Sequence, residues 1–292
     1  MKSADVFLID ASIYVFRSYF SMPDEFRAND GLAVNAVYGF ARFVGKFLRQ
    51  TQASEIAFAF DESLDGSFRN EIYPPYKANR EPAPEELKKQ FVLCRRLTEG
   101  LGIATYSDKS YEADDLIGTL AKSAQDQGKT ICVVSADKDL AQLITDKDTW
   151  WSYGKSEPFD STKVFEKFGV RPTQIADYLA LTGDAVDNIP GVSGVGPKIA
   201  AYLLNHFGDL ETLLNRHKEI AHLSLRGAKS IQKKIQSGLE EAKLAKQLTK
   251  IVTDVPVDSL DMARKATNPE KLTKLFDYMN FGPILRRMLL ES

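Results

Sequence analysis

Three short, largely apolar segments in the first half of the chain most constrain what it can fold into. They are residues 5–9 (DVFLI), 55–60 (EIAFAF) and 130–135 (TICVVS). Segments with helical periodicity separate them, at residues 35–49, 84–101 and 114–127. Short apolar strands that alternate with helices indicate a parallel sheet with both faces covered. We therefore predict an α/β fold.

The pattern changes at about Thr162. From there the chain is predicted to form short helices with glycine turns, and it shows no clear strand. A chain of 292 residues is long enough for one large domain and a smaller one. We place the boundary near residue 165, which gives a sheet domain at residues 1–165 and a helical domain at residues 166–292.

The composition is that of an ordinary soluble globular protein, with 43% hydrophobic and 27% charged residues. No segment approaches the roughly 20 apolar residues that a membrane span requires. The N-terminal segment MKSADVFLIDAS interrupts its apolar run with a charge, so we interpret it as a strand and not as a signal peptide. We expect the protein to stay in the cytoplasm.

The cysteines and histidines argue against a zinc site and against a Cys/His nucleophile. Cys94 and Cys132 lie in apolar segments, which favours buried, reduced thiols. His206, His217 and His222 lack the spacing of zinc ligands. Zinc or Cys/His chemistry is thus nearly excluded.

Acidic side chains follow all three predicted strands. Asp10 follows the first strand, Asp61 the second, and Asp137 with Asp139 the third. Ligands of parallel sheets bind beyond the carboxyl ends of the strands, so we expect these carboxylates to converge. Two further groups have the three-residue spacing that places two acids on one face of a helix. They are Glu112 with Asp115, next to Asp114, and Asp184 with Asp187.

Each of these acids, taken alone, has a second interpretation. An Asp after a strand often caps the next helix, and an acid in the first helical turn complements the helix dipole. Taken together, so many like charges would repel one another, and burial would raise their pKa values. A divalent cation removes both difficulties, and all-oxygen ligands favour Mg²⁺ or Mn²⁺ over zinc or copper. Nine carboxylates exceed the need of one ion, so we expect two sites, about 4 Å apart in the two-metal scheme.

The net charge of −2 is compatible with nucleic-acid binding. If nine carboxylates belong to metal sites, the remainder of the chain carries +7. Bound metal ions would neutralise much of the acidic cluster, and the other surfaces would then be basic enough to hold phosphates.

Motifs along the whole chain resemble those of the 5′ nuclease domain of bacterial DNA polymerase I and the related 5′-3′ exonuclease/flap endonuclease family. The motifs are FLID, AVYGF, FAFD, SFR, YKANR, YEADD, ADKDLAQL, ALTGDAVDNIPGVSGVGPKIA and LRGAK. The resemblance implies a PIN-like parallel sheet flanked by helices, with a smaller helical helix-hairpin-helix (SAM-like) domain.

The same resemblance implies residue roles. Asp10, Asp61, Glu112, Asp114, Asp115, Asp137 and Asp139 match ligands of a first metal region, and Asp184 with Asp187 matches a second. The implied cofactors are two Mg²⁺ ions, with Mn²⁺ as the alternative.

Tyr76, Lys77 and Arg80 match a helical gateway. The two cations would face the scissile phosphate, and Tyr76 would stack on an unpaired base. Arg69 is a further candidate phosphate contact. A solvated basic turn with a core tyrosine is the alternative interpretation.

The glycine-rich segment at residues 191–198 (GVSGVGPK) does not fit a nucleotide-binding loop. Pro197 breaks the Walker pattern, and the segment follows a helix where a Rossmann fingerprint follows a strand. A glycine hairpin between helices presents backbone groups to a phosphate, directly or through a monovalent cation. The resemblance therefore implies DNA contacts at Gly191, Gly194, Gly196 and Lys198, and a K⁺ ion at the hairpin. Arg226, Lys229, Lys233 and Lys234 would add contacts, unless they form a solvated helix face.

The implied function is phosphodiester hydrolysis at 5′ flaps, nicks, junctions and 5′ ends of DNA, by a monomer that acts in replication and repair. RNA–DNA primers are further implied substrates. Two alternatives remain open: a PIN-type ribonuclease or hybrid nuclease, and a non-catalytic junction-binding module. The sequence does not decide between a standalone enzyme and the front of a polymerase. The polar or Pro-rich segments around Gly66 and between Arg80 and Pro84 are typical of mobile segments.

Overall fold

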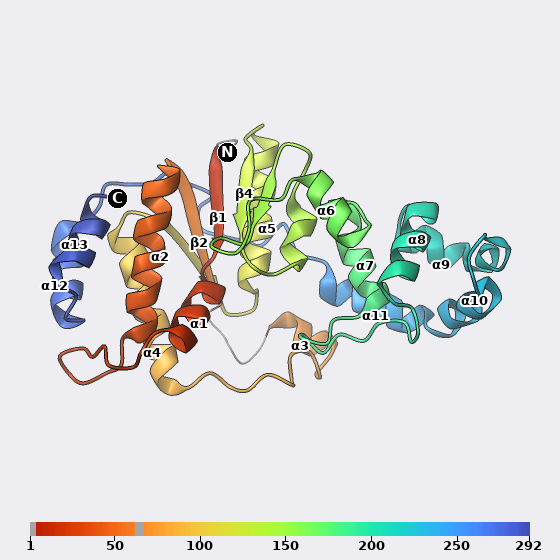
Figure 1. Ribbon diagram of the computed structural model, residues 1–292, viewed down its shortest axis with the longest axis horizontal. Coiled ribbons are helices and arrows are strands. Elements are labelled where there is room, and N and C mark those ends of the chain that lie inside the picture. The colour runs from red at the N-terminus through yellow and green to blue at the C-terminus, as the bar shows by residue number, and fades with distance from the viewer. Residues whose placement is uncertain (1–3, 62–66) are drawn as a thin grey trace. The chain divides into compact units, whose positions relative to one another are not determined.

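A computed structural model describes residues 4–61 and 67–292 (Figure 1). Gly66, at the centre of one expected mobile segment, lies outside the described residues. The chain divides into two compact units. The first, here called the sheet unit, comprises Met1–Gly66, Pro82–Ala136 and Val252–Ser292. The second, here called the helical unit, comprises Ser67–Glu81 and Asp137–Ile251.

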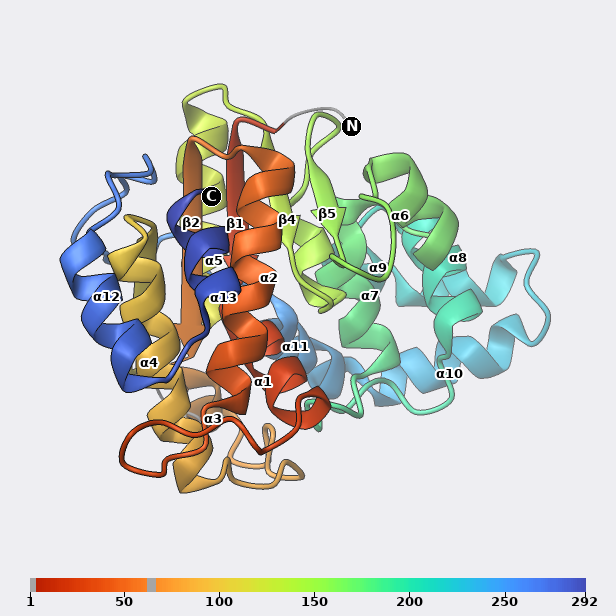
Figure 2. The same cartoon turned by 60° about the vertical axis from the view of Figure 1, so that its left-hand side comes forward.

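This division differs from the expected boundary near residue 165, which falls inside helix α6 (Ser161–Phe168) of the helical unit. The C-terminal segment returns to the sheet unit because its two helices pack on helices of that unit. Helix α12 (Pro269–Tyr278) packs against α4 (Glu85–Gly100), and α13 (Pro283–Leu290) packs against α2 (Asn35–Thr51) (Figure 2). Such packing between distant segments leaves no mark in local sequence patterns.

The sheet unit contains four parallel strands in the order β3-β2-β1-β4. Three of them confirm the predicted strands: β1 (Val6–Asp10), β2 (Glu55–Asp61) and β4 (Ile131–Val134). Their residues are almost all buried, as expected for strands with both faces covered. Strand β3 (Ala104–Asp108) was not predicted, because its polar sequence ATYSD lacks an apolar run; its residues are half-buried.

Helices cover this sheet on both faces. Phe40 of α2 packs against Phe58 and Phe60 of β2, with ring centroids 5.9 Å apart in each pair. Figure 2 shows α2 in front of β1 and β2. Helix α5 (Ala113–Asp126) also contacts β1 and β2, and it occupies the other face. Helix α1 (Ala11–Ser21) follows β1 directly and packs against α2.

The helical unit is built from short helices and one short strand, β5 (Thr149–Trp151). Helix α7 (Ile175–Thr182) packs against α11 (Leu239–Thr249). The buried carboxylate of Asp177 accepts a hydrogen bond from the backbone N–H of Leu210 (2.9 Å) and pairs with Lys246 (2.7 Å), which joins α7, α9 and α11. The other helices are α3 (Phe68–Ile72), α8 (Pro197–Phe207), α9 (Leu210–Asn215) and α10 (Ala228–Ser237), and the 3₁₀ segments are Asp139–Leu143, Pro172–Gln174 and His217–His222.

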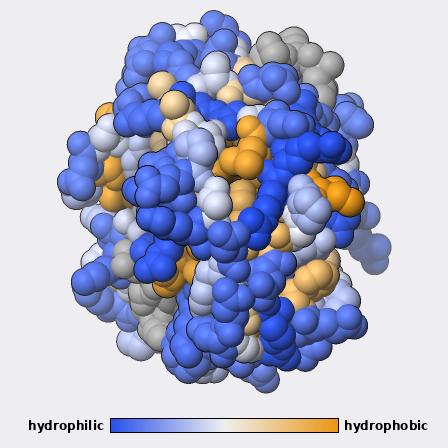
Figure 3. Space-filling model, turned by 90° about the vertical axis from the view of Figure 1, so that its left-hand side faces the viewer, coloured by the Kyte–Doolittle hydropathy of each residue, from blue (hydrophilic) through white to orange (hydrophobic). Residues whose placement is uncertain are grey.

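The core and surface agree with the composition. Both cysteines, Cys94 and Cys132, are buried and free, as predicted. The face shown in Figure 3 is mostly hydrophilic, with small scattered apolar areas. Among the described residues, no helix has the length and apolar character needed to cross a membrane.

Candidate active site

In the sheet unit, acidic side chains lie at the carboxyl ends of two neighbouring strands. Asp10 ends β1 and is buried, and its Oδ2 accepts a hydrogen bond from Ser135 Oγ (2.8 Å). Its Oδ1 caps α1 by accepting from the backbone N–H of Ile13 (3.4 Å). Asp61 ends β2, and its Oδ1 accepts from the backbone N–H of Ala113 (2.9 Å). Asp10 is thus a helix cap, and it also lies at the sheet edge where ligands bind.

The YEADD group begins helix α5. Glu112 is the N-cap residue and forms a capping box with Asp115. Asp115 is fully buried: its Oδ2 accepts from the backbone N–H of Glu112 (3.2 Å) and its Oδ1 from that of Val252 (2.9 Å). Asp114 lies in the first turn. The bond from Ala113 to Asp61 brings the start of α5 to the end of β2, so these acids share one end of the sheet unit.

In the helical unit, Asp137 and Asp139 are held close to other charges. Burial raises the pKa of Asp137, and the nearby charge of Asp187 adds to this, although a backbone hydrogen bond from Asp139 opposes it. Burial raises the pKa of Asp139 well above its usual value, and the charge of Asp137 raises it further. Simultaneous ionisation of Asp137 and Asp139 is therefore unfavourable unless a cation binds next to them.

Asp184 and Asp187 lie in a tight loop, which corrects the expectation that they share a helix face. Helix α7 ends at Thr182, because Gly183 adopts a left-handed φ of 73°. Backbone hydrogen bonds between Asp184 and Ile189 (2.8 and 3.0 Å) then close the loop. Both carboxylates are buried on this loop.

Three cations of the helical unit pair with these aspartates. Arg80 and Lys77 both pair with Asp187, Lys77 at 3.8 Å, and Lys138 pairs with Asp184. Burial lowers the pKa of Lys138, but its hydrogen bond to Asp184 and the charge of Asp139 outweigh burial and raise that pKa overall. Sequence reasoning assigned no role to Lys138, although its position between two aspartates in ADKD is a usable signal.

The donor set fits a hard divalent cation. Oδ1 of Asp139 is buried and has no hydrogen-bond partner among the described residues, and Lys138 Nζ lies 3.8 Å away. Such an orphaned carboxylate oxygen, next to a second carboxylate with a raised pKa, is what an Mg²⁺-type ion neutralises. Across residues 4–61 and 67–292, however, no three acidic side chains are arranged as ready ligands of one ion. The capping bonds and ion pairs described above already engage most of them.

The burial of Tyr76 favours the alternative interpretation, a core tyrosine, over base stacking, and the burial of Arg69 corrects its expected phosphate contact. The Tyr76 side chain is only 4% exposed, so its ring offers no free face for base stacking. Its hydroxyl lies 3.4 Å from Asp187 Oδ2. Arg69 is 2% exposed and donates to the backbone carbonyls of Leu248 (2.8 Å) and Lys250 (3.2 Å). Arg69 thus ties α3 to the end of α11 and does not face a phosphate.

The glycine hairpin lies between α7 and α8, as predicted. Gly194 is exposed and has a φ of 73°, and Gly196 precedes the first turn of α8. Gly191 has a packing role instead: a Cβ there would lie 2.3 Å from the backbone nitrogen of Gly183. Lys198, Arg226, Lys229 and Lys233 are exposed, whereas half-buried Lys234 donates to the carbonyl of Gly194 (3.3 Å).

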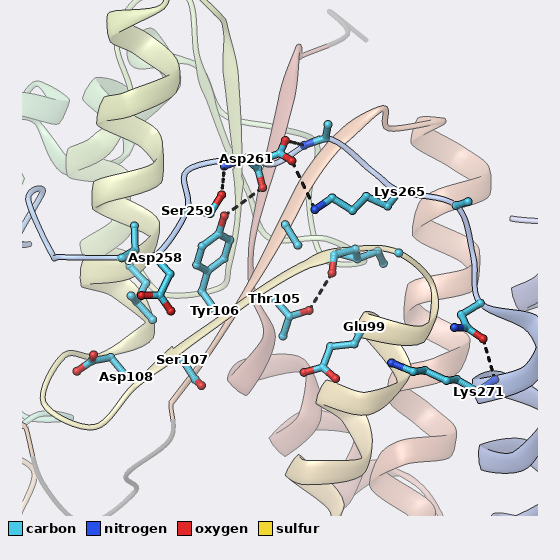
Figure 4. Close-up of a pocket in the computed structure, with 18 of the residues that line it drawn as sticks. Glu99, Thr105, Tyr106, Ser107, Asp108, Asp258, Ser259, Asp261, Lys265 and Lys271 are labelled. Atoms are coloured by element: carbon cyan, nitrogen blue, oxygen red, sulfur yellow. Dashed lines mark hydrogen bonds and ion pairs between the residues drawn. The ribbon is translucent and has the colours of Figure 1, made fainter.

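A cavity of about 680 Å³ opens beside strand β3 of the sheet unit (Figure 4). Its walls include Tyr106, whose hydroxyl donates to the carbonyl of Asp261 (3.2 Å), and Lys265, which pairs with Asp261 (3.6 Å). None of the predicted site residues lines it.

Acids beyond the ends of parallel strands are compatible with a hard-cation site, and a glycine hairpin before a helix with phosphate contacts. Both are features expected of a nuclease that cleaves phosphodiester bonds with the help of metal ions. Two family comparisons agree. Residues 5–169 match the N-terminal resolvase-like domain of 5′-3′ exonucleases, and residues 170–271 match their C-terminal SAM fold. The chain belongs to the 5′-3′ exonuclease/flap endonuclease family. This confirms the resemblance drawn from the motifs, the α/β class and the smaller helical part.

Comparison with individual proteins also finds 5′-3′ exonucleases and DNA polymerases I as relatives. The chain is 34% identical to a 5′-3′ exonuclease of Buchnera aphidicola over 96% of this chain and 98% of that protein. It is 38% identical to DNA polymerase I of Rhizobium leguminosarum over 99% of this chain, but it spans only 29% of that protein.

Solved structures share the fold. T5 5′-exonuclease with bound divalent zinc ions has a TM-score of 0.67 and 20% identity, with 98% of both chains covered. The catalytic core of Rad2 in complex with a DNA substrate has a TM-score of 0.65 and 16% identity, covering 99% of this chain and 92% of that one.

Proposed function

We propose that this protein is a divalent-metal-dependent 5′ nuclease that hydrolyses DNA phosphodiester bonds at 5′ flaps, nicks, junctions and 5′ ends. The observation that carries this proposal is the group of four aspartates in the helical unit, Asp137, Asp139, Asp184 and Asp187, here called the aspartate cluster. In it, a carboxylate oxygen of Asp139 has no hydrogen-bond partner among the described residues, and the cations Lys77, Arg80 and Lys138 pair with the neighbouring carboxylates. Carboxylates that bind metal, next to cations that bind phosphate, supply both parts of phosphodiester hydrolysis.

The proposed metal ligands are the nine predicted carboxylates, in the two regions that the family resemblance assigns. We propose Mg²⁺ as the ion, with Mn²⁺ as the alternative, because every donor is a hard oxygen. When bound, the ions supply an activated water and neutralise the charge that develops on the leaving oxygen. The bound T5 5′-exonuclease ions support a divalent metal in general.

Among the chain's own residues, Lys77 and Arg80 are proposed to hold the scissile phosphate. Both cations pair with Asp187 in this structure. In the proposed complex a phosphate would replace Asp187 as the partner of the cations, and a metal ion would replace the cations as the partner of Asp187. Lys77 is the less exposed of the two, and its proposed role is to stabilise developing negative charge.

The proposed grip on duplex DNA lies at the hairpin and α10. Gly194, Gly196 and Lys198 present backbone groups and an ammonium group, and exposed Arg226 and Lys229 add phosphate contacts. The Rad2 structure with DNA substrate supports DNA as the partner. RNA–DNA primers as further substrates, and a monomeric state, remain part of the proposal.

One cleavage assay tests this function. The purified chain is incubated with a single 5′ flap, a nicked duplex, a single strand and an RNA–DNA hybrid, each in Mg²⁺ and in EDTA. We expect Mg²⁺-dependent release of 5′ products, fastest from the flap or nick. Preference for the hybrid would favour the ribonuclease alternative. Tight flap binding without cleavage in Mg²⁺ or Mn²⁺ would favour the junction-binding alternative.

A further inference from the structure

Two segments of the helical unit are fastened to each other by side-chain amides. Asn188 Nδ2 donates to the carbonyl of Pro75 (2.7 Å), and Asn79 Nδ2 donates to the carbonyl of Ala185 (2.9 Å). Between them, the backbone N–H of Lys77 donates to the carbonyl of Asp187 (2.9 Å). These three hydrogen bonds join two segments that are more than a hundred positions apart in the chain. One is residues 75–80, here called the YKANR segment, and the other is the loop at residues 184–189, here called the aspartate loop.

The backbone is strained at this junction. Lys77 and Asn188 both have a φ of 55°, in the left-handed region. In the described part of the chain only four non-glycine residues have a positive φ, and two of them face each other across this junction. The left-handed region costs a lysine about 1–2 kcal/mol, while asparagine tolerates it better. Such a conformation persists only where neighbouring contacts maintain it.

The hydrogen bonds between the YKANR segment and the aspartate loop keep Lys77 and Arg80 next to Asp187. With both segments held together, Lys77 Nζ lies 3.8 Å from Asp187 Oδ2, and Arg80 pairs with Oδ1 of the same carboxylate. The amides of Asn79 and Asn188 donate to backbone carbonyls of the opposite segment, so neither amide contacts the cations or the carboxylate through these bonds. The two amides therefore affect the site indirectly, because they fix the position of the YKANR segment relative to the aspartate loop.

We propose that Asn188 and Asn79 are positioning residues of the nuclease reaction. Their amides hold the YKANR segment on the aspartate loop and so place Lys77 and Arg80 next to Asp187. This inference rests on the proposed function, in which those two cations hold the scissile phosphate. A displacement of about 1 Å at a reacting centre lowers the rate on the order of 100-fold, so fastening of this kind bears directly on kcat.

The first test compares Asn188→Gly and Asn79→Ala with wild type. Glycine keeps the left-handed backbone of residue 188 and removes only the amide. We expect kcat on a 5′ flap in Mg²⁺ to fall about 10- to 100-fold, with flap affinity in Ca²⁺ within about twofold of wild type. Unchanged kcat in both variants would overturn the proposal.

Asn280→Gly is a matched control. Asn280 has a φ of 53°, and its Nδ2 donates to the carbonyl of Arg27 (3.1 Å) in the sheet unit. The substitution removes the same kind of bond from the same kind of backbone. We expect a similar loss of thermal stability and wild-type kcat. An equal fall of kcat in this control would show a general effect of destabilisation and would overturn the positioning role.

A double-mutant cycle with Arg80→Ala separates positioning from other effects. If Asn188 acts through the cations, its substitution should change kcat much less in the Arg80→Ala background than in wild type. Fully additive effects would contradict the proposal. An inactive wild type would instead refute the proposed function, which is a different outcome.

Limited trypsin digestion gives a readout that needs no catalysis. Release of the YKANR segment should speed cleavage after Lys77 and Arg80 several-fold in Asn188→Gly and Asn79→Ala, and not in Asn280→Gly, with the sites identified by mass spectrometry. Unchanged cleavage at these two sites in both variants would overturn the proposal, whatever the protein's activity.

Discussion

At the scale of single residues, Asp139, a proposed metal ligand, carries a carboxylate whose charged form is disfavoured by burial. One of its oxygens has no hydrogen-bond partner among the described residues. Burial raises the pKa of this carboxylate well above its usual value, and the negative charge of Asp137 raises it further. A residue chosen for stability alone would not carry an ionised group there. The divalent cation proposed above would neutralise this charge and so account for the arrangement.

Asp139→Asn should therefore separate stability from activity. In EDTA at pH 8 we expect the variant to be as stable as wild type or about 1 kcal/mol more stable, because the buried charge is gone. Mg²⁺-dependent flap cleavage should fall on the order of 100-fold or more. Urea denaturation and the flap assay measure the two effects.

Asp148→Asn is the control for that prediction. Asp148 is also buried in the helical unit, but Oδ2 accepts from the Thr145 backbone N–H (2.9 Å) and hydroxyl (2.6 Å). This substitution should destabilise the protein and leave cleavage intact. Cleavage by Asp139→Asn at the wild-type rate would contradict the assignment of Asp139 as a metal ligand.

Residue roles were predictable from the sequence only in part. The positions of the acids after strands were visible, because strand ends and motifs are local. A buried Tyr76 was one of two interpretations that the motif left open, and the burial of Arg69 was not visible. Both depend on partners, such as Asp187 and Leu248, that lie far away in the chain. The basic and aromatic residue types in these motifs therefore suggested contacts with DNA, whereas Arg69 and Tyr76 are packed inside the helical unit.

At the scale of elements, the end of helix α7 sets the position of the aspartate loop. Gly183 turns the chain out of the helix, and Gly191 passes so close that a Cβ would meet the backbone of Thr182 and Gly183 at 2.3–2.4 Å. The loop that carries Asp184 and Asp187 is thereby closed against the helix that precedes it.

Gly191→Ala should consequently destabilise the protein by about 1–3 kcal/mol, because backbone must move to make room for one methyl group. Gly196→Ala is the comparison: no atom lies within 4 Å of a Cβ there. We expect its free energy of unfolding to stay within about 0.5 kcal/mol of wild type. Equal denaturation midpoints for the two variants would contradict the close approach at Gly191.

The same scale shows where sequence patterns succeed. Strands β1, β2 and β4 and helices α2, α4 and α5 were predicted to within two residues, because continuous apolar runs mark these strands and helical apolar periodicity marks these helices. Strand β3 and the loop after Thr182 were mistaken, because polar strands and glycine-ended turns carry no such period.

At the scale of the whole molecule, the near-zero net charge includes acids that the surface does not carry. Asp139, Asp184 and Asp187 are buried, whereas basic residues such as Lys198 and Lys229 are exposed. Binding to DNA is then expected to depend on salt as in a basic protein.

Lys198→Ala and Lys229→Ala should each reduce the slope of log affinity against log salt by about 0.9 for duplex DNA. Lys271→Ala, an exposed lysine on α12 of the sheet unit, should leave the slope unchanged. Fluorescence anisotropy in Ca²⁺ measures all three. Equal slopes for all variants and wild type would remove the hairpin and α10 from the proposed DNA contacts.

The return of the last segment to the sheet unit has a consequence for synthesis on the ribosome. The helical unit is complete at Ile251, whereas the sheet unit still lacks Val252–Ser292, which supplies α12 and α13 against α4 and α2. Of the two units, the one whose translation begins first is thus the last to be completed. A nascent chain that stalls before residue 252 exposes the apolar surfaces of α2 and α4, and such truncated products are natural targets for chaperones and proteases.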